Sequence, residues 1–158
     1  MKTQCLFNLI HSLKQVFVKK KSFIFFFFVK LVILHVKSET HLFLSSHFFS
    51  QLWQLVRNWF GVYSANPSNI MDHFYHLGTS SGYGKSRCSL MHLIWFACSW
   101  VLWKERNDRL FQNKENSSTQ ILENIKLLSF WWFKAASVNF YYRFHNWCQN
   151  PFLYAGID

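Results

Sequence analysis

The fold is decided by the stretch from Ser86 to Phe111, which reads SRCSLMHLIWFACSWVLWKERNDRLF. Apolar residues cover nearly every side of the predicted helix as far as Trp103. A helix that is apolar all round is stable only when it is buried, because any side facing water would leave apolar surface hydrated. We therefore expect the middle of this helix to be covered by the rest of the chain or by a partner.

A second helix is predicted before this stretch. Between Phe48 and Phe60 the Phe, Leu, Val and Trp residues recur at helical spacing, and Gly61 is a suitable stop. Residues 62–85 are rich in Gly, Ser and Asn, which is typical of a loop, with a short helical turn expected at 69–76.

A third helix is predicted after the stretch. Either Ser118 or Thr119 can cap it, and Glu123 falls in its first turns, where the helix dipole favours an anion. We expect this helix to continue to about Trp147 and to end at residues 150–151, Asn-Pro.

These elements predict a mainly α protein with three or four helices joined by long loops. Near the N-terminus the sequence is compatible with a short β segment or with a single membrane-spanning segment. The predicted divisions are a hydrophobic and basic N-terminal segment at 1–37, a motif region at 38–61, a loop at 62–85, a Trp-rich helical region at 86–150 and a tail at 151–158.

The N-terminal segment has two interpretations. The run at 22–36 is apolar apart from Lys30, but it is shorter than the roughly 20 apolar residues that span a bilayer. Extending it to 16–36 adds the three Lys at 19–21, which would hold that end in the cytosol. A buried β-type segment is the alternative, because Phe, Ile and Val favour strands. The side chains that would contact lipid are Phe23, Phe25, Phe26, Phe27, Phe28, Leu31, Val32 and Ile33.

The composition indicates a preference for anionic partners. The 158 residues hold 17 Lys and Arg against seven Asp and Glu, a formal charge of +10. Such an excess favours phosphate backbones and anionic membrane surfaces. Aromatic residues make up 21% of the chain, so exposed aromatic patches are expected.

Two motifs carry a resemblance to a known family. The first is Glu39-Thr40-His41-Leu42-Phe43-Leu44-Ser45-Ser46, followed by Trp53. The second is Trp100-x-x-Trp103-Lys104-Glu105-Arg106-Asn107-x-x-Leu110-Phe111. Together they resemble the zinc-binding domain and the adjoining C-terminal region of plant LINE-type (non-LTR) reverse transcriptases, over roughly 38–132.

The resemblance implies a degenerate zinc site. The intact family binds zinc through a Cys-x-x-Cys pair, a His and a further Cys. His41 stands where the ligand His stands, but Ser46 replaces the last Cys and no upstream Cys pair is present. Structural zinc needs four N or S donors. We therefore expect no zinc and no other cofactor.

Other candidate chemistry has weaker support. His73, His76, Cys88 and His92 could supply four metal donors, or could be an ordinary loop and helix start. Residues 78–85 resemble a phosphate loop, but the spacing between its glycines is one residue too long. No carboxylates form a catalytic set with a His or Ser, so no catalytic residues and no small-molecule substrate are predicted. The four Cys lack paired spacing, which favours free thiols, and Cys98 is expected to fill the core.

The end of the central helix offers a nucleic-acid surface. Lys104, Arg106 and Arg109 are expected to be exposed beside Trp100 and Trp103, where bases could stack and phosphates could bind. The alternative, which we favour, is a helix end packed by its Trp residues and closed by Arg and Asn hydrogen bonds.

The sequence therefore predicts a degenerate retrotransposon-derived fragment that is not an enzyme and binds RNA or DNA at most weakly and without specificity. Such a protein would be nuclear or cytoplasmic if soluble. The alternative is a small single-pass membrane protein anchored by residues 16–36.

Overall fold

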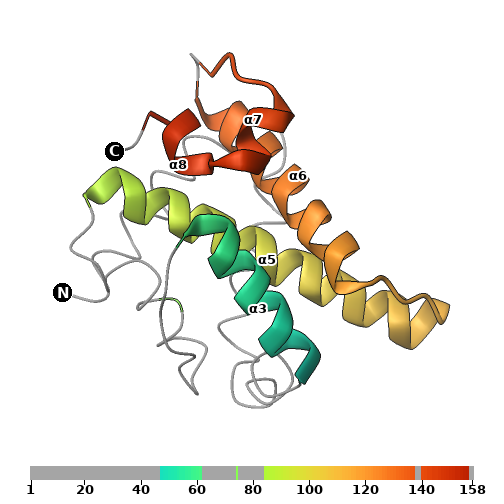
Figure 1. Cartoon of the computed structure of the whole chain (residues 1–158). Helices are drawn as coiled ribbons and strands as arrows, with labels where there is room; N and C mark the ends of the chain where they lie inside the picture. The colour runs from blue at the N-terminus through green and yellow to red at the C-terminus, as the bar shows by residue number, and fades with distance from the viewer. Residues whose placement is uncertain (1–46, 62–73, 75–83, 138–139, 157–158) are drawn as a thin grey trace.

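The structure is a computed structural model that describes residues 47–61, 74, 84–137 and 140–156 (Figure 1). The elements in this part of the chain are helices, and the prediction of a mainly α protein is confirmed. They are α3 (His47–Phe60), α5 (Lys85–Gln112), α6 (Ser118–Ala136), α7 (Phe144–Gln149) and α8 (Pro151–Tyr154).

The architecture is built around α5, the longest of these helices. After the short connection at 113–117 the chain reverses, and α6 packs back along α5 (Figure 1). Helix α3 contacts α6, and α7 contacts both α6 and α8. The connection and α7 thus lie at opposite ends of α6, whose 19 residues span roughly 28 Å.

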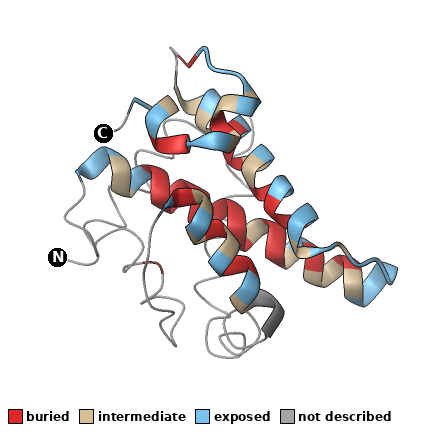
Figure 2. Ribbon diagram, in the orientation of Figure 1, coloured by how far each residue is buried: buried red, intermediate tan, exposed pale blue. Residues whose placement is uncertain are grey.

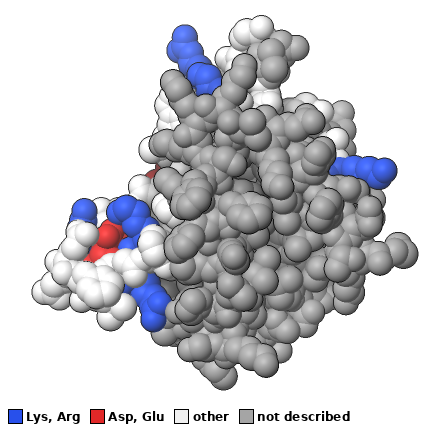
Figure 3. Space-filling model, turned by 180° about the vertical axis from the view of Figure 1, so that it is seen from behind, with Lys and Arg blue, Asp and Glu red and all other residues white. Residues whose placement is uncertain are grey.

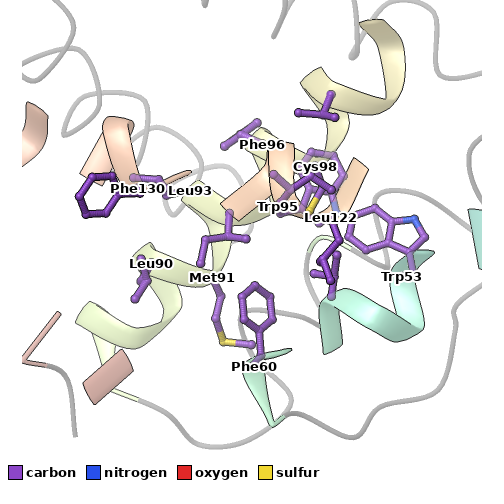
Figure 4. Close-up of a cluster of buried hydrophobic side chains, with 14 of the residues drawn as sticks. Trp53, Phe60, Leu90, Met91, Leu93, Trp95, Phe96, Cys98, Leu122 and Phe130 are labelled. Carbon is purple, nitrogen blue, oxygen red and sulfur yellow. The ribbon is translucent and has the colours of Figure 1, made fainter. Parts of the chain in front are cut away.

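Helix α5 is buried on all sides in its middle. Every residue from Leu90 to Ser99 is buried, as the red part of α5 in Figure 2 shows. Side chains from α3, α5 and α6 meet in one cluster around it (Figure 4). The cluster includes Cys98, so the expectations of a covered central helix and of a core cysteine are both confirmed.

Helix α3 buries one face. Leu52, Trp53, Val56 and Phe60 are buried and recur at the spacing of a helical stripe. Gly61 follows with φ of +66°, a left-handed conformation that ends helices and that Gly adopts without steric cost. The predicted helix and its stop are confirmed.

Helix α6 begins at Ser118, so its N-cap lies one residue before Ser118 and two before Thr119, the two predicted caps. Ser117 is the N-cap: its Oγ accepts from the Gln120 N–H at 3.3 Å, and the Ser117 N–H donates to Gln120 Oε1 at 2.9 Å. This reciprocal pair is a capping box, and it favours Ser117 over Ser118 and Thr119 as the N-cap because two backbone N–H donors are satisfied at once. The first turn holds no acidic residue, and Glu123, expected in the first turns, lies in the second.

Helix α6 also ends earlier than predicted, at Ala136 rather than near Trp147. A continuous helix would place Trp147 roughly 16 Å beyond Ala136, away from the core. The chain instead turns, and Phe140 and Trp147 are buried with ring centroids 5.8 and 6.2 Å from Phe130. The Trp147 indole Nε1 donates to Ser129 Oγ at 3.1 Å, and both residues are fully buried.

Asn150 both ends α7 and begins α8. Its Oδ1 accepts from the N–H groups of Phe152 and Leu153, each at 3.1 Å, and Pro151 takes the first helical position. Phe152 is buried against Phe60 of α3 and the Arg87 guanidinium of α5, with 5.8 Å between the ring centroids and 4.3 Å from the guanidinium carbon to the Phe152 centroid. Residues 150–151, the predicted stop of the third helix, therefore end α7 instead, and the predicted tail begins with a helix.

Candidate nucleic-acid interface

The three predicted phosphate-binding side chains lie on the last three turns of α5, and two of them are bound to carboxylates. Lys104 Nζ is 2.7 Å from Asp108 Oδ2, and Arg109 Nε is 2.8 Å from Glu105 Oε1. Lys104 is exposed as expected. The expected exposure is wrong for Arg106 and Arg109, which are half-buried, because this turn of α5 faces the start of α6.

Glu105 organises this end of the molecule. Its side chain is only 3% exposed and accepts three hydrogen bonds. Arg109 Nε donates to Oε1, the Asn116 N–H donates to Oε1 at 2.9 Å, and Asn116 Nδ2 donates to Oε2 at 2.6 Å. The carboxylate therefore ties α5 to the residue that precedes the α6 N-cap.

The hydrogen bonds keep Glu105 ionised. Burial alone would raise the pKa of its carboxyl, because the charged form loses hydration. The bonds from Asn116 and Arg109 outweigh burial and hold the pKa below its ordinary value. Glu105 was not among the predicted functional residues, although its spacing of four residues from Arg109 predicts an ion pair on a helix.

Carboxylates also lower the positive potential at this end. Glu115 Oε1 lies 4.0 Å from Arg109 Nη1, in addition to the pairs with Glu105 and Asp108. Figure 3 shows red carboxylate atoms among the blue groups here. A phosphate approaching Arg109 would have to compete with two carboxylates, so this surface is a poor phosphate site.

The two Trp residues of the motif pack onto the protein. Trp100 and Trp103 are half-buried, their ring centroids are 5.4 Å apart, and Trp100 lies against the core cluster. This agrees with the interpretation of a packed helix end. The hydrogen bonds that Arg109 and Asn116 donate to Glu105 lie at this helix end, in keeping with the Arg and Asn hydrogen bonds of that interpretation.

The metal-ligand candidates are only partly covered by the structure. His41, Ser46, His73 and His76 lie outside the described residues. Within 47–61, 74, 84–137 and 140–156 no group of three or more His, Cys, Asp or Glu is placed to hold a metal ion.

His92 sits in an apolar site on α5. Its ring stacks on Phe74 with 4.1 Å between centroids, and the side chain is buried. Burial lowers the pKa of His92 to about 4, against the opposing effect of a hydrogen bond with the Phe74 backbone. The imidazole is therefore neutral near pH 7. Cys88, one turn earlier, is half-buried.

The remaining sequence candidates lie mainly outside the described part. The lipid-facing residues of the alternative anchor, between Phe23 and Ile33, are among them, as are residues 78–83 of the phosphate-loop candidate. None of the described helices combines the length and the apolar character that crossing a membrane requires.

A second basic surface, which the sequence analysis missed, lies at the far end of α6. The described residues within 127–156 include Lys134 and Arg143 and contain no carboxylate. Lys134 Nζ lies 5.4 Å from the ring centroid of Trp131, which is 54% exposed. The one sequence signal for this surface is that residues 124–156 are rich in aromatic residues and contain no Asp or Glu.

Comparisons of the chain with known protein families, with curated proteins and with solved structures find no match. The family resemblance therefore rests on its two motifs alone and stays a prediction.

Proposed function

We propose that this protein is a retrotransposon-derived helical fragment that binds nucleic acid weakly and without sequence specificity, and that it is not an enzyme. One observation carries the binding proposal. The described residues include ten Lys and Arg and four Asp and Glu, which leaves a net charge of +6. Each of those four carboxylates already has a cationic partner in the chain, as the pairs of Glu105, Asp108, Glu115 and Glu123 show.

The remaining charge attracts polyanions for a simple reason. When Lys and Arg neutralise phosphates, counterions leave the nucleic acid, and their release drives binding whatever the base sequence. The formal charge of +10 on the whole chain acts in the same direction. The two motifs that resemble plant LINE-type reverse transcriptases support the same partner class, and they support an origin in such an element.

The salt dependence of binding tests this function. Anisotropy of a labelled single-stranded RNA should show an affinity that falls about ten- to fifty-fold between 50 and 200 mM salt, as expected for roughly three or four phosphate contacts. The affinities for two unrelated sequences should agree within a few-fold. A slope of zero would remove the proposal, and a strong preference for one sequence would contradict its non-specific character.

Metal analysis tests the degenerate character of the motif at 38–61. Purified protein should carry less than one zinc per chain, because His41 lacks Cys partners at the spacing that a closed zinc site needs. Stoichiometric zinc that survives dialysis would overturn this part of the proposal.

The membrane alternative rests on the apolar run at 22–36. Carbonate extraction of a tagged full chain separates the two functions. Release of the protein into the supernatant supports the nucleic-acid proposal, whereas retention in the membrane pellet supports an anchor.

A further inference from the structure

The end of α6 and the segment that follows it expose a group of aromatic and basic side chains. Their exposure is notable because aromatic rings are usually buried when a core is available. Trp131 is 54% exposed, Tyr141 85% and Tyr142 48%, and Figure 2 shows exposed residues along the segment that precedes α7. We call this group the aromatic–basic end; it comprises Trp131, Lys134, Tyr141, Tyr142 and Arg143.

The exposed rings rest on a rigid support of buried rings. The Trp131 centroid is 5.4 Å from that of Phe130, and the Tyr142 centroid is 5.7 Å from that of Phe140. Phe130 and Phe140 are themselves in contact at 5.8 Å, and both are buried beside Trp147. Trp131 and Tyr142 are thus attached to one ordered framework, so a ligand that stacks on them loses little conformational entropy in the protein.

The charges of the aromatic–basic end are suited to phosphate. Lys134 Nζ lies above the Trp131 ring, and Lys134 and Arg143 are both exposed. The described residues between 124 and 156 contain no carboxylate that could compete for these cations. The α5–α6 connection differs on this point, because Glu105, Asp108 and Glu115 already pair with Lys104 and Arg109 there.

We propose that the aromatic–basic end binds single-stranded nucleic acid, with unpaired bases stacked on Trp131 and Tyr141 and phosphates bound by Lys134 and Arg143. Single strands are favoured because the faces of paired bases are already covered by their neighbours in a duplex, whereas unpaired bases can lie on aromatic rings. This inference rests on the proposed function and deepens it, since it names the strand type and moves the site away from Lys104, Arg106 and Arg109.

The test compares two variants of the full chain. In W131A/Y141A two exposed rings are removed from the aromatic–basic end. In F111A a ring that is 82% exposed is removed from the end of α5, close to the ion pairs. Because all three side chains are exposed, thermal unfolding should be nearly unchanged in both variants.

Binding is measured with a labelled oligouridine and with a labelled RNA duplex. We expect W131A/Y141A to bind the single strand at least ten-fold more weakly, since each stacked base contributes a factor of about five or more. F111A should change this affinity less than two-fold, and both variants should bind the duplex as the wild type does. W131F/Y141F should retain most of the single-strand affinity, because Phe can still stack.

Several outcomes would overturn the inference. If W131A/Y141A binds oligouridine like the wild type, or if F111A has the larger effect, the stacking site is wrong while the proposed function stands. If the wild type binds neither RNA, both proposals fail. If W131A/Y141A loses binding to anionic phosphatidylserine vesicles while its RNA affinity is unchanged, the aromatic–basic end binds a membrane surface and the inference is wrong.

Discussion

The two ends of α6 show two different ways of fastening one helix to a small fold. At its start, a buried carboxylate collects hydrogen bonds from Arg109 and Asn116. At its end, buried rings surround Trp147, and the main polar link is the single hydrogen bond from its indole to Ser129. The position of the first end is set by charged, directional hydrogen bonds. The position of the second is set mainly by the close packing of large rings.

The difference also separates stability from binding. Lys104 and Arg109, near the start of α6, are engaged by carboxylates, so these two side chains have little left to offer a ligand. Those at the other end, Lys134 and Arg143, lie on a surface whose described residues include no acid. A count of basic residues along the sequence therefore does not locate a phosphate-binding surface unless the positions of the acids are counted with it.

The largest expected effect comes from removing the ring at the centre of the aromatic packing. Trp147→Ala should lower the free energy of unfolding by about 3–5 kcal/mol, because the residue is fully buried and its neighbours cannot refill the space. Urea denaturation measures the change. Trp131→Ala, which removes an exposed ring of the same size, should change stability by less than about 1 kcal/mol. Equal losses in the two variants would contradict the packing described for α7.

The second effect concerns the buried carboxylate. Glu105→Ala leaves the Arg109 guanidinium and two Asn116 donors without their acceptor, and should cost about 2–4 kcal/mol. Glu105→Gln keeps an acceptor oxygen and should cost less. Glu123→Ala, which removes an exposed carboxylate from its pair with Lys126, should cost under about 1 kcal/mol and serves as the control. A cost for Glu105→Ala no greater than that control would show that the network contributes little.

Acid should reveal a third effect, at His92. Its pKa is lowered to about 4 in the folded chain, so between pH 6.5 and 4 the unfolded chain binds a proton that the folded chain excludes. The free energy of unfolding therefore falls as the pH is lowered through this window, by about 2–3 kcal/mol at most. His92→Phe should remove that slope in urea titrations at several pH values, and an unchanged slope would refute the assignment.

Glu105 should act in a more acidic window. Its pKa is lowered by Asn116 and Arg109, so its stabilisation is complete above the ordinary Glu value near 4.3 and is lost as the pH falls through the folded value. The same titration of Glu105→Gln should lose this lower part of the dependence and keep the part that belongs to His92.

The smallest effect distinguishes the observed helix cap from the predicted one. Ser117→Ala should destabilise the protein by about 1 kcal/mol, because the N–H of Gln120 loses its acceptor. Ser118→Ala, at the neighbouring position, should change thermal stability by a few tenths at most. The reverse order would place the cap where the sequence alone suggested it.

The helices that the sequence predicted well are those in which local pattern and packing agree. The central helix, predicted at 86–111, is observed at 85–112, and the helix predicted from Phe48 is observed at 47–60. The overlong third helix has a physical explanation. No Gly or Pro lies between residues 118 and 150 to end the helix. The turn is favoured instead by the packing of Phe140 and Trp147 around Phe130.

The residues of the candidate site could be predicted from the sequence, but the contacts that they make could be predicted only in part. The sequence identified Lys104 and Arg109, and their acidic partners lie at helical spacing, so two of the ion pairs could have been found. The hydrogen bonds from Asn116 to Glu105 join residues eleven apart and depend on the path of the connection. The aromatic–basic end depends on the early stop of α6, which no local signal marks.

The unbroken burial of α5 from Leu90 to Ser99 has a consequence for synthesis. This helix is synthesised before α6, α7 and α8, and α6 is the helix that packs along it. At ordinary elongation rates the wait lasts on the order of seconds, far longer than a helix needs to form. During that interval the apolar side chains of α5 lack the cover that α6 provides. A truncated product ending near Gln112 should therefore bind chaperones strongly.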